Sequence, residues 1–154
     1  IDDFNYEYSN FFVTIKYKNN KIIKIDYNAA YSNFIFNIDF SYNYLIKINE
    51  NFFIKFSRVK EVYLNNNKFN NFSKNLFKEL FSLEILNLSS NYLTHIQIGL
   101  FDDLYSLKHL DLSYNLIFSI DDFTFQKLKN LISLRLDLNL DLNYLTNNTF
   151  HGLE

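Results

Sequence analysis

An apolar pattern with a period of 24 residues runs through most of this chain and restricts its fold more than any other feature. Segments 83–106 and 107–130 match position by position when one is shifted onto the other. In the first segment the matching residues are Leu83, Leu86, Leu88, Asn91, Leu93, Ile96, Phe101 and Leu104. A fixed period of this length indicates a solenoid built from stacked copies of one supersecondary unit.

The period extends in both directions from these two segments. Toward the C-terminus it keeps phase through Asn139, and one extra residue then places Leu142, Leu145, Phe150 and Leu153 one position late. Toward the N-terminus it weakens, because Ala30 and Asn33 replace two apolar positions. We therefore expect an N-terminal flank or incomplete cap at 1–11, followed by repeats at 12–34 (degraded), 35–58, 59–82, 83–106, 107–130 and 131–154 (with a one-residue insertion).

Each part of the repeat has a physical reason. Leu86 and Leu88 alternate with Asn87 and Ser89, which predicts a short strand with one face inside, and neighbouring repeats should pair these strands into a parallel sheet. An Asn recurs at positions 20, 43, 67, 91, 115 and 139, where its amide can bond backbone groups of adjacent turns. A Phe recurs at positions 53, 77, 101, 125 and 150, and we expect these rings to stack as a spine on the convex side.

This pattern resembles the leucine-rich repeat family, specifically its 24-residue type with a late Phe, as found in Toll-like receptor and Slit-type ectodomains. The resemblance covers residues 12–154, and the segment from Thr149 to Leu153 also looks like the extracellular type. It implies an α/β solenoid in the form of a horseshoe. Short parallel β-strands would line the concave face, and loops or short helical turns the convex face.

The outward side chains of such a sheet form a regular grid, and the concave face is where solenoids usually bind their partners. Tyr42, Tyr63 and Tyr114 are the candidate anchors, because Tyr and Arg dominate interface hot spots. By phase, the central column of this grid consists of Lys16, Asp39, Tyr63, Asn87, Asp111 and Arg135. A neighbouring column, which includes Ser41 and Ser113, is expected to lie on the same exposed face. The predicted ligand-binding residues are Asp39, Tyr42, Glu61, Tyr63, Asn87, His109, Asp111, Tyr114, Arg135 and Asp137.

Composition excludes several other kinds of site. The net charge is −2, which does not favour nucleic acid, and the absence of cysteine removes thiolate catalysis and cysteine-based zinc sites. The three histidines fall at different phases of the repeat, and the pairs Asp102–Asp103 and Asp121–Asp122 lack the spacing and Gly of a calcium loop. We interpret those pairs as solvated loop charge, and we expect no enzyme activity, cofactor or metal.

Three N-x-S/T sequons occur, at Asn71, Asn87 and Asn147. Asn71 and Asn147 fall on predicted loops and are the candidate glycosylation sites. Asn87 falls in the middle of the predicted concave face, where a glycan would block binding.

Two hypotheses follow for the function of the chain, which does not begin with Met and which we interpret as part of a longer protein. The first is a ligand-recognition segment of a secreted or cell-surface receptor or adhesion protein, with a protein ligand or co-receptor as partner. The second is a cytoplasmic scaffold or regulatory subunit of an enzyme, which the lack of cysteine in residues 1–11 supports. Neither predicts membrane contact within this segment, and oligomerisation could arise through the parent protein.

Overall fold

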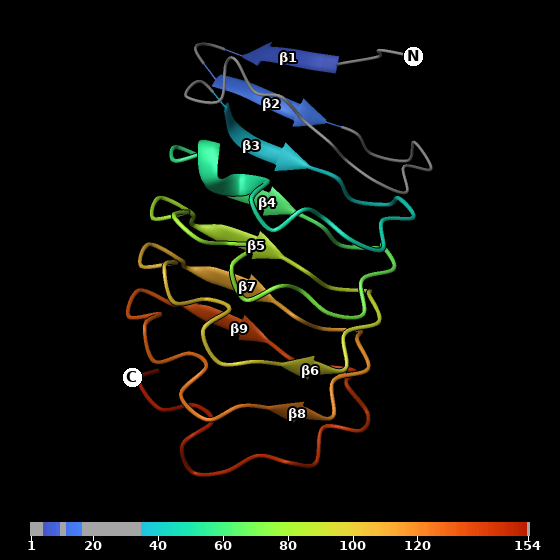
Figure 1. The fold of residues 1–154 in the computed structure, drawn as a ribbon, viewed down its shortest axis with the longest axis vertical. Helices are drawn as coiled ribbons and strands as arrows, with labels where there is room; N and C mark the ends of the chain where they lie inside the picture. Colours follow the sequence, from blue (N-terminus) through green and yellow to red (C-terminus); the bar gives the residue numbers. More distant parts are fainter. Residues whose placement is uncertain (1–4, 10–11, 17–34, 154) are drawn as a thin grey trace.

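The computed structural model describes residues 5–9, 12–16 and 35–153, with side chains described from residue 35 onward. Figure 1 shows strands stacked one above another along the long axis of the molecule. From residue 35 onward, each repeat contributes one strand of the main sheet and a long return. The strands are β1 (Asn5–Ser9), β2 (Phe12–Lys16), β3 (Ile35–Asp39), β4 (Glu61–Tyr63), β5 (Ile85–Asn87), β6 (His95–Ile96), β7 (His109–Asp111), β8 (Ser119–Ile120) and β9 (Ser133–Arg135).

The main sheet contains seven strands in the order β1-β2-β3-β4-β5-β7-β9. β1 and β2 pair antiparallel, and every later pair is parallel. From β3 to β9 the partners are 24 residues apart, as with Val62 beside Leu86 and Leu86 beside Leu110. The predicted parallel sheet is therefore confirmed, and the change to antiparallel pairing falls where the apolar period breaks.

The interior is a continuous apolar column filled by the repeated positions. Val62, Leu86 and Leu110 point inward from the sheet and are buried, while their neighbours along each strand are partly or fully exposed. No repeat could bury this set alone, so stacking supplies the core.

The Asn column forms a hydrogen-bonded ladder inside the turns. Nδ2 of Asn91 donates to the carbonyls of Leu64 (3.1 Å) and Leu88 (3.0 Å), and its Oδ1 accepts the N–H of Phe69 at 3.2 Å. The same three bonds recur at Asn67, Asn115 and Asn139. This confirms the prediction for the described repeats, while Asn20 lies outside the described residues.

The Phe column forms the predicted spine. The rings of Phe77, Phe101 and Phe125 are buried, and successive centroids lie 6.4 and 6.1 Å apart with nearly parallel planes. Phe53 and Phe150 extend the column at its two ends. Each ring thus covers the next, which excludes water from the side opposite the sheet.

The convex side differs in one respect from the prediction. Among the described residues the only helix is a single 3-10 turn, η2 (Phe53–Lys55), so none is long and apolar enough to cross a membrane. Instead, β6 and β8 form a small parallel sheet, with His95 beside Ser119 and Ile96 beside Ile120. We did not predict this sheet, because two-residue strands are too short to show an alternating pattern.

A turn in the left-handed region follows each strand of repeats 35–58 to 131–154. Its residues are Tyr42, Asn66, Ser90, Tyr114 and Leu138, all with φ between 54° and 58°. Among non-glycine residues, Asn, Asp and His adopt this conformation most readily. The other four residues therefore occupy it at a conformational cost.

Two serines just before this turn correct the sequence analysis. Ser41 and Ser113 were expected on the exposed face, but they are buried, with only 1% of Ser113 accessible. Their hydroxyls donate to Oδ1 of Asp39 (2.6 Å) and Asp111 (2.5 Å). The prediction was wrong because it extended the strand alternation into a segment where the chain already turns.

The last repeat packs against one described neighbour only. Leu142 and Leu153 are partly buried against the core, as their phase predicts. Leu145, predicted to be interior, is 42% exposed.

Candidate functional site

The outward side of β3, β4, β5, β7 and β9 is the surface predicted to bind a partner, and we call it the strand face. Parallel pairing places Asp39, Tyr63, Asn87, Asp111 and Arg135 in one row across five strands. Glu61 and His109 lie in the adjacent row, two residues earlier on their strands. Tyr42 and Tyr114 do not lie on the strands but project from the turns that follow, where both are about half exposed.

Arg135 is the centre of an ion-pair network at the C-terminal end of this row. Its Nη1 lies 3.2 Å from Oδ2 of Asp111, while Nε and Nη2 bond the two carboxylate oxygens of Asp137 at 3.2 and 3.1 Å. The hydrogen bond to Asp137 and the charges of both carboxylates raise the pKa of Arg135. The guanidinium is therefore held in one orientation before any partner arrives, which reduces the entropy lost on binding.

Tyr63 is the aromatic residue at the centre of the strand face. Its hydroxyl donates to Oε2 of Glu61 at 3.1 Å. Burial, followed by the charge of Glu61, raises the pKa of Tyr63 to about 12. The phenol thus stays protonated at neutral pH and keeps its donor pointed along the face.

A row of charges borders the strand face on the side where the strands begin. Glu84 bonds Nζ of Lys60 at 2.5 Å and Nζ of Lys108 at 2.7 Å, and these three residues are 24 apart. The hydrogen bonds from Lys108 and Lys60 lower the pKa of Glu84 to about 2. This row of charges was not predicted, although the common spacing of the three charged residues was available as a signal.

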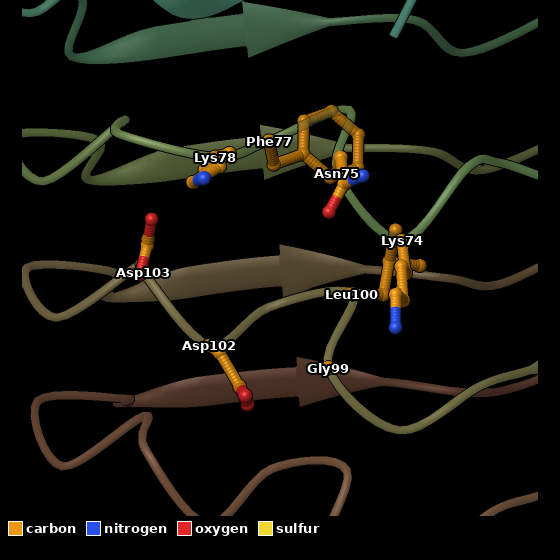
Figure 2. A pocket seen from close by; sticks show the side chains of 8 residues that line it. All are labelled: Lys74, Asn75, Phe77, Lys78, Gly99, Leu100, Asp102 and Asp103. Atoms are coloured by element: carbon orange, nitrogen blue, oxygen red, sulfur yellow. The ribbon is translucent and has the colours of Figure 1, made fainter.

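Two hollows of similar size lie on opposite sides of the solenoid. One occupies the strand face, encloses about 210 Å³ and is lined by Asn87, His109, Asp111, Arg135 and neighbouring residues. The other, of about 220 Å³, lies between two convex loops, and in Figure 2 the side chains of Asp102 and Asp103 point in different directions around it. Both are smaller than the roughly 300–1,000 Å³ of typical small-molecule sites. An extended surface of this kind suits a protein better than a small ligand.

The strand face does not assemble a general base and nucleophile. His109 and Asp111 are neighbours on β7, but Oδ1 of Asp111 accepts Ser113 and its Oδ2 accepts Arg135. The carboxylate is thus committed to other partners and does not orient the imidazole, while the Ser113 hydroxyl is buried. Among the described residues no three His, Asp or Glu side chains gather as metal ligands.

The convex acidic residues bind neighbouring repeats, which corrects their interpretation as solvated charge. Oδ2 of Asp103 accepts the N–H of Glu79, and Oδ2 of Asp121 accepts the N–H of Ile98, both at 2.9 Å. Asp121 also lies 3.2 Å from Nε2 of His95. The prediction failed because spacing within one loop shows nothing of the backbone donors that the preceding repeat presents.

His95 also contacts Ser119, at 2.7 Å from Nδ1 to Oγ, and so forms a Ser–His–Asp trio that the sequence analysis did not find. The hollow beside His95 is lined by Asn71, Phe72, Thr94, Ile96, Gln97 and Leu100. Ser119 does not line it, so its hydroxyl does not face that space. The trio joins β6 to β8 across the convex side.

The three sequons occupy different surroundings. Asn71 and Asn147 are exposed on loops, as predicted. Asn87 is partly buried on β5, and its Oδ1 accepts both the N–H (3.0 Å) and the hydroxyl (2.8 Å) of Ser89. The first and third residues of this sequon are therefore hydrogen-bonded to each other within the strand face.

Comparison with known proteins agrees with this architecture. The sequence profile described as leucine rich repeat matches residues 57–117 and 106–154, which together span more than half of the chain. The chain belongs to the leucine-rich repeat family. No curated protein sequence matches this leucine-rich repeat chain.

The leucine-rich repeats of this chain are similar in structure to those of Toll and of a Toll-like receptor. One is the Toll–Spätzle complex of Drosophila, with a TM-score of 0.67 and 28% identity over 69% of this chain and 14% of that one. Another is the TLR13–ssRNA13 complex, with a TM-score of 0.58 and 24% identity over 78% of this chain and 20% of that one. The second likeness shows the fold alone. The chain spans less than a quarter of either structure.

Proposed function

We propose that this leucine-rich repeat segment recognises a protein ligand through its strand face, as part of a secreted or cell-surface receptor or adhesion protein. The supporting observation is the row from Asp39 to Arg135, which crosses five neighbouring strands. This row contains Tyr63 and also Arg135, whose guanidinium is held in place by Asp111 and Asp137. Tyr and Arg are the residue types that most often carry interface energy.

The two structural relatives differ in what they bind. The structure similar at 28% identity contains Toll with the protein Spätzle, whereas the other contains TLR13 with single-stranded RNA. In this chain the strand face carries Asp39, Glu61, Asp111 and Asp137 against one arginine. A phosphate backbone requires cationic neutralisation, so this charge balance supports a protein ligand.

A triple variant, Tyr63→Ala, Asp111→Ala and Arg135→Ala, tests the proposal. Each side chain is at least partly exposed and none belongs to the core, so we expect the variant to stay folded and to melt cooperatively. Its melting temperature should be lower than that of the parent chain, because Asp111→Ala removes the acceptor of the buried Ser113 hydroxyl and N–H. A matched control changes three exposed convex residues, Ile54→Ala, Lys78→Ala and Lys127→Ala.

The three proteins would be immobilised and exposed to the secreted proteins of the source organism, and separately to single-stranded RNA. We expect a protein that the parent chain and the convex control retain but the triple variant loses by at least about tenfold in affinity. Equal capture by all three proteins, or retention of RNA alone, would contradict the proposal.

We also propose Asn71 and Asn147 as glycan acceptors, in line with a secreted or cell-surface location. Peptide mapping of the chain after passage through a eukaryotic secretory pathway measures this directly. Glycans at those two sites are expected, and a glycan at Asn87 would exclude the centre of the strand face as the binding surface.

A further inference from the structure

Two aspartates of the strand face, Asp39 and Asp111, occupy equivalent positions and make the same local contacts. Oδ1 of Asp39 accepts the N–H (2.9 Å) and the hydroxyl (2.6 Å) of Ser41. Oδ1 of Asp111 accepts the N–H (2.9 Å) and the hydroxyl (2.5 Å) of Ser113. Each carboxylate is therefore held in one orientation by its own segment, and its Oδ2 is left for another partner.

The two aspartates differ in the residue that the next strand places beside them. Next to Asp111 lies Arg135, whose Nη1 bonds Oδ2 of the aspartate at 3.2 Å. Next to Asp39 the same row position holds Tyr63, and Oδ2 of Asp39 has no partner among the residues that the structure describes. The molecule thus shows how an aspartate in this arrangement binds a guanidinium, and at Asp39 the described chain supplies none.

Glu61 adds a second carboxylate with an open oxygen at this end of the strand face. Its Oε2 accepts the Tyr63 hydroxyl at 3.1 Å, whereas its Oε1 has no partner in the described part of the chain. Tyr63 lies one strand from Asp39, about 4.8 Å across the sheet, and two residues after Glu61, roughly 6.6 Å along the strand. The partly exposed Tyr63 ring is thus flanked by two carboxylates, each with one oxygen free.

The distribution of charge also favours a cation at β3 and β4. From β3 to β9 the strand face carries four carboxylates and one arginine, and that arginine is paired with Asp111 and Asp137 at the opposite end. A ligand cation is therefore repelled by Arg135 and attracted by the unpaired carboxylates. On the other side of Asp39 the register places Lys16 of β2, so the position for the cation is on the β4 side.

The hollow on β5, β7 and β9 fits a neutral group of the same ligand. It is lined by the amide Nδ2 of Asn87, the imidazole of His109 and the hydroxyl of Ser133, which have no partner among the described residues. Arg135 also lines the hollow but is already paired with two carboxylates. A main-chain carbonyl satisfies such donors, whereas a ligand carboxylate would meet like charges.

We propose that the ligand of the strand face is a basic protein segment that places an arginine side chain on the ring of Tyr63, with its guanidinium bonded to Asp39 and Glu61. This inference rests on the proposed function and adds the chemistry of the partner. An aromatic ring attracts a cation over its face. A guanidinium is planar and has five N–H donors, so it can cover the ring and reach carboxylates on two strands, whereas the ammonium of lysine is a compact charge.

Titration of the 154-residue chain with small peptides, followed by proton–nitrogen NMR, tests the proposal without knowledge of the natural ligand. The probe is the blocked pentapeptide acetyl-Ser-Gly-Arg-Gly-Ser-amide. Its controls replace the arginine by citrulline, which has nearly the same shape and no charge, or by glutamate. We expect the arginine peptide to shift the backbone amide signals of Asp39, Glu61 and Tyr63, with a Kd on the order of millimolar, and both controls to bind at least about tenfold more weakly.

A double variant, Asp39→Asn with Glu61→Gln, identifies the carboxylates that bind the probe. Both substitutions keep an acceptor for the bonds from Ser41 and Tyr63, so thermal melts should show a folded chain. The variant should weaken binding of the arginine peptide by at least about tenfold. The matched control, Asp137→Asn with Asp141→Asn, removes two exposed charges elsewhere and should change the affinity by less than about twofold.

Several results would overturn this inference. They are the absence of shifts with the arginine peptide, equal binding of the citrulline peptide, shifts centred on β7 and β9, or equal losses in the two double variants. A protein ligand that the strand face binds equally well after Asp39→Asn and Glu61→Gln would also overturn it and would leave the proposed function standing. The proposed function fails separately, if the triple variant at Tyr63, Asp111 and Arg135 loses no protein.

Discussion

The interior of each repeat and its strand face follow the same 24-residue spacing, but only the interior keeps its residue types. The ladder position is occupied by Asn in all five repeats from residue 35 onward. The central row of the strand face instead changes from repeat to repeat and consists of Asp39, Tyr63, Asn87, Asp111 and Arg135. From Asn67 to Asn139 each ladder Asn donates to backbone carbonyls of its own repeat and of the preceding one and accepts one N–H, a combination that a short carboxamide side chain supplies.

Side chains on the strand face satisfy most of their hydrogen bonds within two residues of their own position. Tyr63 bonds Glu61, and Asp39 bonds Ser41. A substitution there removes a local contact and leaves no backbone group of another repeat unpaired. Stability therefore depends on the positions that repeat, and recognition can use the positions that vary.

The largest expected effect comes from the Phe spine. Phe101→Ala should lower the free energy of unfolding by about 3–5 kcal/mol, because it removes a fully buried ring between Phe77 and Phe125. Phe81→Ala removes a half-exposed ring stacked on Tyr105 and should cost about 1 kcal/mol. Urea denaturation measures both, and equal losses would break the distinction between interior and surface columns.

The Asn ladder should give a smaller loss. Asn91→Ala leaves the Phe69 N–H without its partner, while the carbonyls of Leu64 and Leu88 keep Asn67 and Asn115 as donors. We expect a loss of about 2–3 kcal/mol, since one buried backbone group becomes unpaired. Amide hydrogen exchange should show faster exchange at Phe69.

Asn70→Ala is the control for this measurement, because Asn70 is exposed in the segment that follows β4. It should change the free energy of unfolding by less than about 0.5 kcal/mol. A comparable loss in both variants would mean that the ladder contributes no more than an exposed amide.

The smallest effect is expected at the border of the strand face and depends on pH. Because the lysines lower the pKa of Glu84 to about 2 from 4.5, its charged form stabilises the folded state above pH 4.5. This contribution is lost as the pH falls from 4.5 to 2, when the carboxylate becomes protonated. Glu84→Gln should therefore lower the melting temperature slightly at neutral pH and not at pH 2.

Glu50→Gln provides the comparison, since its carboxylate contacts the Ser73 hydroxyl rather than two lysines. Melting curves of both variants between pH 2 and 7 measure the difference. If the difference in melting temperature between Glu84→Gln and the parent chain stays the same across that range, the Lys60–Glu84–Lys108 row does not stabilise the fold.

The sequence predicted those parts of the fold that recur at one phase. The parallel register, the Asn ladder and the Phe spine all follow from residues 24 apart, because stacking brings equal phases together. The small β6–β8 sheet and the burial of Ser113 could not be predicted in this way. They depend on where the backbone leaves the strand conformation, which side-chain type alone does not show.

For the candidate site, the same phase argument placed Asp39, Tyr63, Asn87, Asp111 and Arg135 in one row. It could not show that Arg135 spans Asp111 and Asp137, since that contact depends on side-chain conformation. The exposure of Leu116 and Phe118 was also not predicted, because these residues look like core residues until the burial of Asn115 and Ile117 is known. Which ligand the row fits depends on contacts that lie outside this chain.

Through the Asn ladder, each repeat depends on the repeat that follows it for the partner of one backbone N–H group. From Asn67 onward, the Oδ1 of each ladder Asn accepts an N–H from the repeat before it, as Asn115 does from Leu93 and Asn139 from Ile117. If the stack frays from its C-terminal side, every repeat that peels away leaves an unpaired N–H in the repeat that remains. Fraying from the N-terminal side leaves each remaining Nδ2 with a carbonyl of its own turn, so the ladder side chains hold the two ends of the same stack unequally.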